Sequence, residues 1–265
     1  MDHRLAGSTE PDMKPSVLLD TNLVPNEAGG THLAVIPYQA HPPSTPGITL
    51  RIHTSATSPL IPLLAATNAL AGMTDPFNLL LNREKHPSGL TYPLALQNNI
   101  DRITTKLQQG CIMVSASPSS CSDNGSSGYA AVACWAPPTA TAQMEIDEGD
   151  DLLIPELAHR PVMQNAVRVW AVERRKVLPL HWNGGRKWWY VSLMARHPEM
   201  AAVKGAVRAV IEVGLKWADE EGCPVWLEAG NERARDVYAA FGFREIAITV
   251  MGGGRGRRGR CRFGV

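Results

Sequence analysis

The sequence contains no long uninterrupted hydrophobic run. Its longest apolar stretch, Leu60 to Met73, is broken by Pro62, Thr67 and Asn68. A membrane-spanning helix needs about 18 or more consecutive apolar residues. We therefore expect no transmembrane segment and no membrane partner.

The start of the chain lacks the features of a secretory signal. The first fifteen residues carry Asp2, Arg4, Glu10 and Asp12 and hold no apolar stretch, whereas a signal peptide needs a hydrophobic segment of about 7–15 residues. We therefore expect a protein that stays inside the cell, in the cytoplasm, with the nucleus as the compartment that the sequence leaves open.

Cysteine is scarce and has no paired spacing. The chain has five cysteines, an odd number, and no two of them form a Cys-x-x-Cys pair. Disulfide scaffolds and structural zinc sites need paired or closely spaced cysteines. We expect free thiols and no metal.

The common motifs of nucleotide-binding and hydrolytic enzymes are also missing. The sequence has no Walker loop, no His-Glu-x-x-His helix and no Gly-x-Ser-x-Gly elbow. Gly254, Gly256 and Gly259 form a formal Gly-x-Gly-x-x-Gly, but only six residues follow it. A dinucleotide site requires a helix after the third glycine, so this match is a false positive.

The composition predicts one packed domain with a basic end. Of the 265 residues, 44% are hydrophobic and 19% are charged, which is too apolar for a wholly disordered chain. Residues 1–45 are rich in Pro, Gly, Ser and Thr without sustained periodicity, and we expect a flexible tail there. We place the folded domain at residues 46–265.

The residue pattern in the first half of this domain predicts one strand, then a group of helices, and then two hairpin strands. Alternation of apolar and polar residues at Ile48–Ile52 indicates a half-buried strand. Further elements are expected as helices from Ser58 through Leu70, from Asp75-Pro76 and over Leu94–Gln109, and as hairpin strands at Cys111–Ser115 and Gly128–Trp135. The acidic run Glu145–Asp151 is expected as a solvated loop.

The second half alternates strands and helices. The pattern predicts a helix over Val162–Glu173, a buried strand over Trp188–Met194, a helix over Val207–Ala218, a strand over Val225–Glu228, a helix after Asn231 and strands over Phe243–Val250 and Cys261–Val265. Asn231 is a good N-cap and Gly242 a good helix end. The result is a mixed α/β domain.

One segment of this second half carries a family resemblance. The run Leu227-Glu-Ala-Gly-Asn-Glu-Arg-Ala234, followed by Tyr238 and Gly242-Phe243, resembles the last motif block of the GNAT superfamily of acyl-CoA N-acyltransferases. Trp189 to Pro198 is similar to the family's central strand and the turn after it, and Gly128–Pro138 to the strand before it. The resemblance implies a GNAT-like mixed twisted β-sheet flanked by helices, and acetyl transfer from acetyl-CoA to a primary amine.

The resemblance also implies where acetyl-CoA would bind. In the family the central strand parts from its neighbour, and the freed backbone groups pair with the cofactor arm. This places the cofactor against Leu193, Met194, Ala195, Asn231 and Ala234, and its pyrophosphate at a helix start formed by Lys204, Gly205 and Ala206. The family pattern there has more glycines than Ala202–Val207, which retains only Gly205; Lys204 is either a phosphate contact or a solvated side chain.

Tyr238 and Glu228 are the candidate catalytic residues. The resemblance implies that Tyr238 protonates the departing thiolate, for which a phenol is suited; the alternative is a tyrosine that only packs on its helix. The central strand offers no carboxylate, so Glu228 is the best general base, ahead of His197 and His181. Glu228 could instead pair with an arginine.

The acceptor and an alternative function remain open. By the resemblance, Ser58–His86 and Pro137–Val162 wall the side where a small-molecule or peptide amine binds. The last fourteen residues hold five arginines, from Arg255 to Arg262, and no acid. Such a segment is either a solvated loop between strands or a phosphate-binding surface. The alternative function is therefore a weak or inactive member of the fold whose Arg/Gly loop binds nucleic acid or a protein partner.

Overall fold

The computed structural model describes residues 47–120, 128–148, 157–178, 187–200, 203–251 and 259–264, all of which belong to one compact unit. The tail predicted at residues 1–45 lies outside the described residues. In the described ranges, every helix is too short or too polar to cross a lipid bilayer. The same ranges contain no group of three or more His, Cys, Asp or Glu side chains arranged to hold a metal ion.

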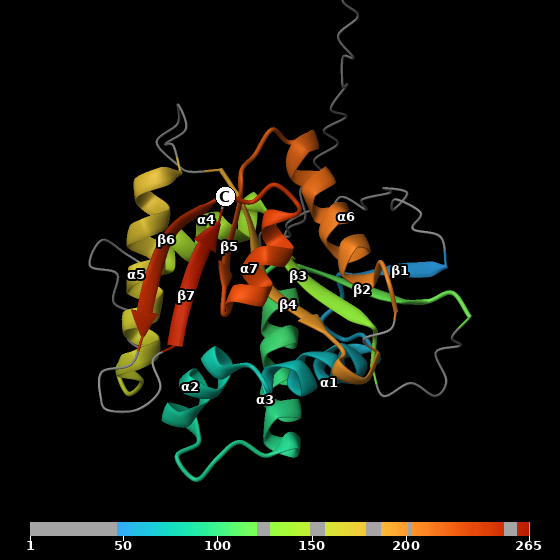
Figure 1. The fold of residues 1–265 in the computed structure, drawn as a ribbon, viewed down its shortest axis with the longest axis horizontal. Coiled ribbons are helices and arrows are strands. Elements are labelled where there is room, and N and C mark those ends of the chain that lie inside the picture. Colours follow the sequence, from blue (N-terminus) through green and yellow to red (C-terminus); the bar gives the residue numbers. More distant parts are fainter. Residues whose placement is uncertain are drawn as a thin grey trace, which may run out of the picture. The chain divides into compact units, whose positions relative to one another are not determined.

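A single mixed sheet organises these residues (Figure 1). Its strand order is β1-β2-β3-β4-β5-β7-β6. The strands are β1 (Ile48–His53), β2 (Ile112–Pro118), β3 (Ala131–Ala136), β4 (Trp189–Arg196), β5 (Val225–Ala229), β6 (Glu245–Met251) and β7 (Gly259–Gly264). All neighbouring pairs are antiparallel except β4 and β5, which run parallel.

Helices cover both faces of the sheet. Their bounds are α1 (Ile61–Gly72), α2 (Pro76–Lys85), α3 (Tyr92–Gln108), α4 (Pro138–Glu148), α5 (Pro161–Val177), α6 (Ala206–Glu220) and α7 (Glu232–Ala239). Side chains of α1 to α5 pack into one apolar core with one face of the sheet, and side chains of α6 and α7 pack into a second core on the other face. This arrangement follows from the period-two burial of the strands and the apolar stripes of the helices.

The parallel pair β4 and β5 is joined over only three positions. Trp189, Tyr190 and Val191 pair with Val225, Trp226 and Leu227, and no pair joins the two strands beyond Val191. On its other edge β4 remains paired with β3 up to Arg196. Among the residues that the structure describes, no strand pairs with this second edge of β4 after Val191.

A bulge in β4 lies at the point where the strands separate. Cys134 pairs with Leu193 and the next β3 residue, Trp135, pairs with Val191, so Ser192 is the extra residue. A bulge bends its strand and increases the local twist. The bulge at Ser192 therefore directs the end of β4 away from β5.

The expected fold class is confirmed, with two local corrections. Glu145 to Glu148 belong to helix α4 rather than to a loop, and the first helix begins at Ile61 rather than at Ser58. In the first case a helix begins at Pro138, and because adding residues to an existing helix is easy, it extends through the acidic residues. In the second, Ser58 bonds the Leu60 backbone locally, and Pro62 occupies the first helical turn. Cys111, Cys134 and Cys223 are buried free thiols, as expected.

Candidate functional site

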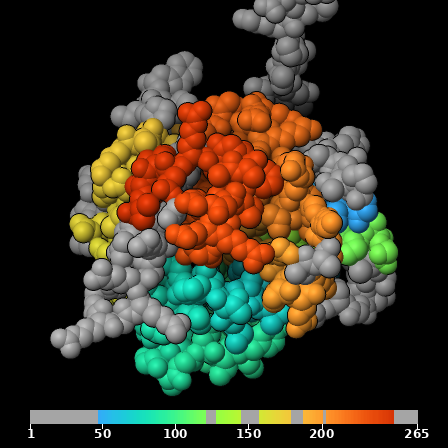
Figure 2. All heavy atoms as spheres, viewed as in Figure 1, coloured from blue at the N-terminus to red at the C-terminus, as the bar shows by residue number. Residues whose placement is uncertain are grey.

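A cavity of about 640 Å³ opens where β4 and β5 separate. One wall consists of the free half of β4, the end of β5 and the start of α7; the other consists of α1, α2, α3 and the beginning of α5. Figure 2 shows these two parts of the chain meeting on one face, α7 in orange-red against α1 and α2 in blue-green. The cavity therefore joins the C-terminal motif to the N-terminal helices.

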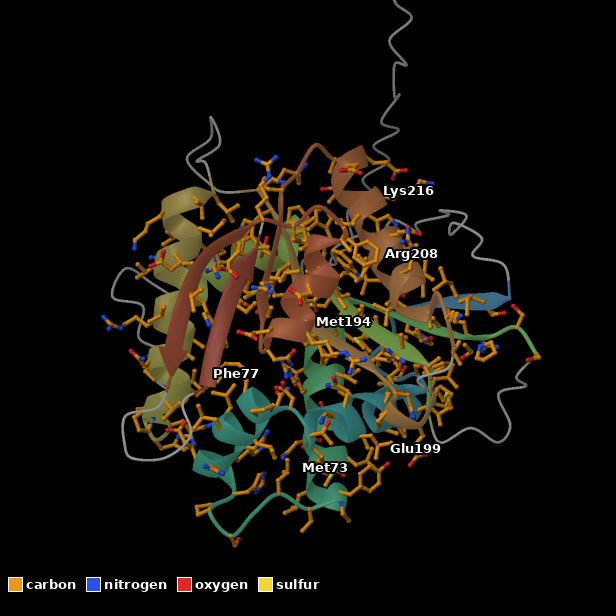
Figure 3. All side chains as sticks on the ribbon, viewed as in Figure 1. Met73, Phe77, Met194, Glu199, Arg208 and Lys216 are labelled. Carbon is orange, nitrogen blue, oxygen red and sulfur yellow. The ribbon has the colours of Figure 1, made fainter. Side chains whose placement is uncertain are left out.

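Backbone and side chains of β4 line the cavity beyond the last β5 pair. Leu193, Met194 and Ala195, the three residues predicted to contact a cofactor arm, all line it. Figure 3 labels Met194 on this strand and Phe77 at the start of α2, on the opposite wall. An extended ligand in the gap can pair with the free strand edge as a neighbouring strand would.

Tyr238 reaches the same cavity from α7. Its side chain is buried, lines the cavity and packs edge-on against Phe243, with ring centroids 5.7 Å apart. Burial, and then the charge of Glu228, raise the pKa of the phenol above its usual value. The hydroxyl is thus held in its protonated, hydrogen-donating form.

Glu228 is held by two hydrogen-bond donors. The Tyr190 hydroxyl donates to Oε2 and the Trp226 indole N–H donates to Oε1, each at 2.6 Å. Both donors stabilise the ionised carboxylate. Burial and the Glu228 charge in turn raise the pKa of the Tyr190 phenol well above its usual value. The structure therefore places an oriented carboxylate beside Tyr238 in the cavity.

The start of α7 is tied to the loop before α2. Asn231 caps α7 by accepting a hydrogen bond from the Ala234 backbone N–H at 2.9 Å, as its sequence position predicted. Its side-chain amide also donates to Asp75 at 2.8 Å. Asn231, Ala234 and Asp75 all line the cavity, so this contact fixes its two walls relative to each other.

The predicted phosphate-binding residues lie at the start of α6. Gly205 is the N-cap and has a φ of 85°, which a residue with a Cβ rarely adopts. Lys204 is exposed, Ala206 is buried, and none of the three lines the cavity. β4 ends at Arg196 and α6 begins at Ala206, so the unpaired N–H groups of the first turn of α6 come soon after the free end of β4 in the chain.

Of the two histidines predicted as weaker general bases, the described one, His197, does not join this site. His197 is fully buried, binds the Ala130 carbonyl through its backbone N–H and accepts from the Glu199 N–H at Nδ1, and it does not line the cavity. His181 lies outside the described residues. So do residues 252–258 of the Arg/Gly segment, whereas Gly259–Gly264 form β7 between β5 and β6.

Sequence reasoning missed three residues that shape the cavity. Arg102 on α3 donates a 3.1 Å hydrogen bond to the carbonyl of Ser192, the bulge residue. The sequence marks Asp75 as a helix start and Tyr190 as a buried strand residue, and it indicates no role for either in a site. Local sequence carries no signal for these contacts, because each joins elements that are distant along the chain.

Comparisons with known proteins give partial matches. No protein-family model matches the chain. Increased recombination centers protein 11 of Saccharomyces cerevisiae is 32% identical over 83 residues, which are 31% of this chain and 51% of that protein. The uncharacterised S. cerevisiae protein YDR391C is 34% identical over 78 residues, 29% of this chain and 32% of that protein. The matches thus span about half and about a third of these relatives.

Solved structures with a similar chain arrangement include three from other organisms. Arylalkylamine N-acetyltransferase 2 from Aedes aegypti has a TM-score of 0.49 and 13% identity, covering 81% of this chain and 97% of that one. Drosophila melanogaster polyamine N-acetyltransferase gives 0.44 and 11%, covering 82% and 98%. Arabidopsis thaliana NAA60 in complex with acetyl-CoA gives 0.42 and 12%, covering 82% and 96%.

Proposed function

We propose that this chain is an N-acetyltransferase that moves an acetyl group from acetyl-CoA to a primary amine in a ternary complex. The observation that carries the proposal is the separation of β4 from β5 at Val191, with Tyr238 and Glu228 lining the cavity that results. The similarity of Leu227–Phe243 to the last GNAT motif block supports the same reading, because the motif and the strand separation occur together.

The residues present fit an acyl-CoA. The free edge of β4 at Leu193–Ala195 offers backbone N–H and C=O groups to the amide-containing arm. The first N–H groups of α6, after Gly205, offer donors and a positive helix end for the pyrophosphate, and Lys204 adds a point charge. Asn231 and Ala234 bound the arm on the α7 side.

Acetyl-CoA supplies a thioester whose carbonyl carbon accepts the attacking amine and whose sulfur leaves. Glu228 takes the proton that the nitrogen loses as the C–N bond forms, directly or through a water. Tyr238 donates its proton to the sulfur as the C–S bond breaks, and its raised pKa keeps that proton in place until then. Tyr190 and Trp226 hold Glu228 in position for its part.

The test is amine-dependent release of free thiol from acetyl-CoA by the purified full chain. We expect acetyl-CoA to raise the melting temperature, and Tyr238→Phe to lower turnover about 100-fold or more while sparing that shift. Phe241→Leu, in the turn that follows α7 and outside the cavity lining, is the matched control. No shift at millimolar acetyl-CoA, together with salt-sensitive RNA retention, would favour the non-enzymatic alternative instead.

A further inference from the structure

The acceptor side of the cavity carries cations that have no carboxylate partner. Lys85 on α2, Arg102 on α3 and Arg160 before α5 all line it. Within the residues the structure describes, none of the three has a carboxylate oxygen within 4.0 Å. Each instead donates to a neutral oxygen: of Asn98 at 2.5 Å, of Ser192 at 3.1 Å and of Leu81 at 3.0 Å.

The Asp75 carboxylate on that side is already satisfied by neutral donors. Asp75 accepts from the Asn78 backbone and side chain at 2.8 and 2.9 Å, and from Asn231 at 2.8 Å. Asp101 accepts from Gln97 at 2.8 Å. The exposed guanidinium of Arg102 keeps unused donors, because it has five N–H groups and donates one hydrogen bond to Ser192.

Arg102 stands next to the reacting centre. It binds the carbonyl of Ser192, where β4 leaves β5. Its charge also acts on the Tyr190 phenol, opposing the larger effects of burial and of Glu228 on the pKa of that group. Tyr190 in turn donates to Glu228. The Arg102 guanidinium and the proposed proton acceptor thus both act on the same phenol and line the same cavity.

An apolar corner lies between α2 and α5 in the same cavity. It is formed by Phe77, Leu81, Met163 and Trp170, and the rings of Phe77 and Trp170 pack together with centroids 5.9 Å apart. Such a surface gains from covering an aliphatic or aromatic group.

From these three features we infer that the acceptor is a small amine that bears a carboxylate and an apolar side chain, such as an apolar α-amino acid, and that Arg102 binds its carboxylate. Guanidinium and carboxylate match in a two-point hydrogen-bonded pair. The amine then faces Glu228 and the side chain enters the apolar corner. The inference rests on the proposed acetyl transfer and names its acceptor class.

The test compares leucine with leucinamide and isoamylamine, which lack the carboxylate. Each is assayed by thiol release with the full chain, with Arg102→Gln and with Arg83→Gln, an exposed arginine on α2 as control. The basicity of a given amine is the same for every variant. The ratio of its kcat/KM between wild type and variant therefore reports only the effect of the substituted arginine. We expect Arg102→Gln to lower kcat/KM for leucine at least tenfold, and that for leucinamide less than twofold.

Two further measurements make the outcome decisive. Arg102→Lys, which keeps the charge but not the two-point fork, should recover part of the leucine activity. The acetyl-CoA melting shift should be the same in all variants. If the wild type acetylates isoamylamine but not leucine, or if Arg102→Gln slows leucine and leucinamide equally, the carboxylate assignment is wrong. If the wild type acetylates no amine, the proposed function itself fails.

Discussion

Tyr190 and Glu228 meet across the parallel strands β4 and β5 through a 2.6 Å hydrogen bond. Tyr190 is the register partner of Trp226, and Glu228 follows Trp226 on the same face of β5. The phenol, the indole and the carboxylate are therefore neighbours by strand geometry alone. This places an oriented anion one residue beyond the last paired rung, Val191 with Leu227, where the strands separate.

The first prediction concerns the strength of this contact. Tyr190→Phe removes a buried donor to an ionised carboxylate, and such hydrogen bonds contribute about 1.5–3 kcal/mol to stability. We expect a loss of that order in the free energy of unfolding, measured by urea titration. Tyr92→Phe, at an exposed position on α3, should change it by less than about 0.5 kcal/mol. An equal, small loss in both variants would show that the Tyr190 bond contributes little.

A second prediction concerns the packing of α6 on the sheet. The indole of Trp135 is fully buried, donates to the Val210 carbonyl at 3.1 Å and occupies the space where a Cβ on Gly214 would lie. Gly214→Ala should therefore destabilise the protein by about 3 kcal/mol or more, by overpacking. Gly72→Ala, at the end of α1, is the control: its Cβ would make only ordinary van der Waals contact with Asn78, and the change should be neutral or slightly stabilising. Equal thermal midpoints for the two variants would contradict the packing described.

The third prediction is a loss of stability in acid. His53 is buried, hydrogen-bonds Ser115 at 2.9 Å, and its pKa is lowered to about 4, first by burial and then by Arg51. Above pH 6.5 the ring is neutral in both folded and unfolded chains. Between pH 6.5 and 4 only the unfolded chain takes the proton, so stability falls by about 3 kcal/mol over that window.

Replacing the ring tests this assignment. His53→Gln should flatten the dependence of the unfolding free energy on pH between 6.5 and 4. The exposed His159→Gln should leave the wild-type dependence unchanged. If His53→Gln still loses the full unfolding free energy between pH 6.5 and 4, groups other than His53 cause that loss.

The fourth prediction follows from the raised pKa of Tyr238. Because burial and Glu228 hold that pKa above its usual value of 10, the phenol stays protonated throughout the ordinary assay range. We expect kcat to show no alkaline decline from this group below pH 10. A decline with a midpoint below pH 10 that disappears in Tyr238→Phe would contradict the environment described for the phenol.

Much of the fold was predictable because its signals are local. The β5 strand, the Asn231 cap and helix α7 follow from residue types over a short stretch, and all three occur as expected. The errors arose where local signals compete. Ser58 and Pro62 both favour a helix start, and the acidic residues 145–148 favour a loop unless a helix has already begun at Pro138.

The site was only partly predictable, because its geometry depends on distant contacts. The motif predicts Glu228 and Tyr238 as site residues. The donors that hold Glu228 depend on how β4 pairs with β5, and the sequence alone does not reveal that register. Arg102 lies 90 residues before Ser192, and nothing in its own helix distinguishes it from a solvated arginine. Contacts of this kind become visible only once the strands and helices are placed together.

The central claim is that an acyl-CoA lies against the free edge of β4. Hydrogen exchange of the backbone amides, measured with and without saturating acetyl-CoA, tests it most directly. We expect slower exchange at the amides of Leu193–Arg196 that point away from β3 and in the first turn of α6, with β1 and β2 unchanged as the internal control. Binding of acetyl-CoA that leaves the β4 amides exchanging at their original rates would contradict the claim.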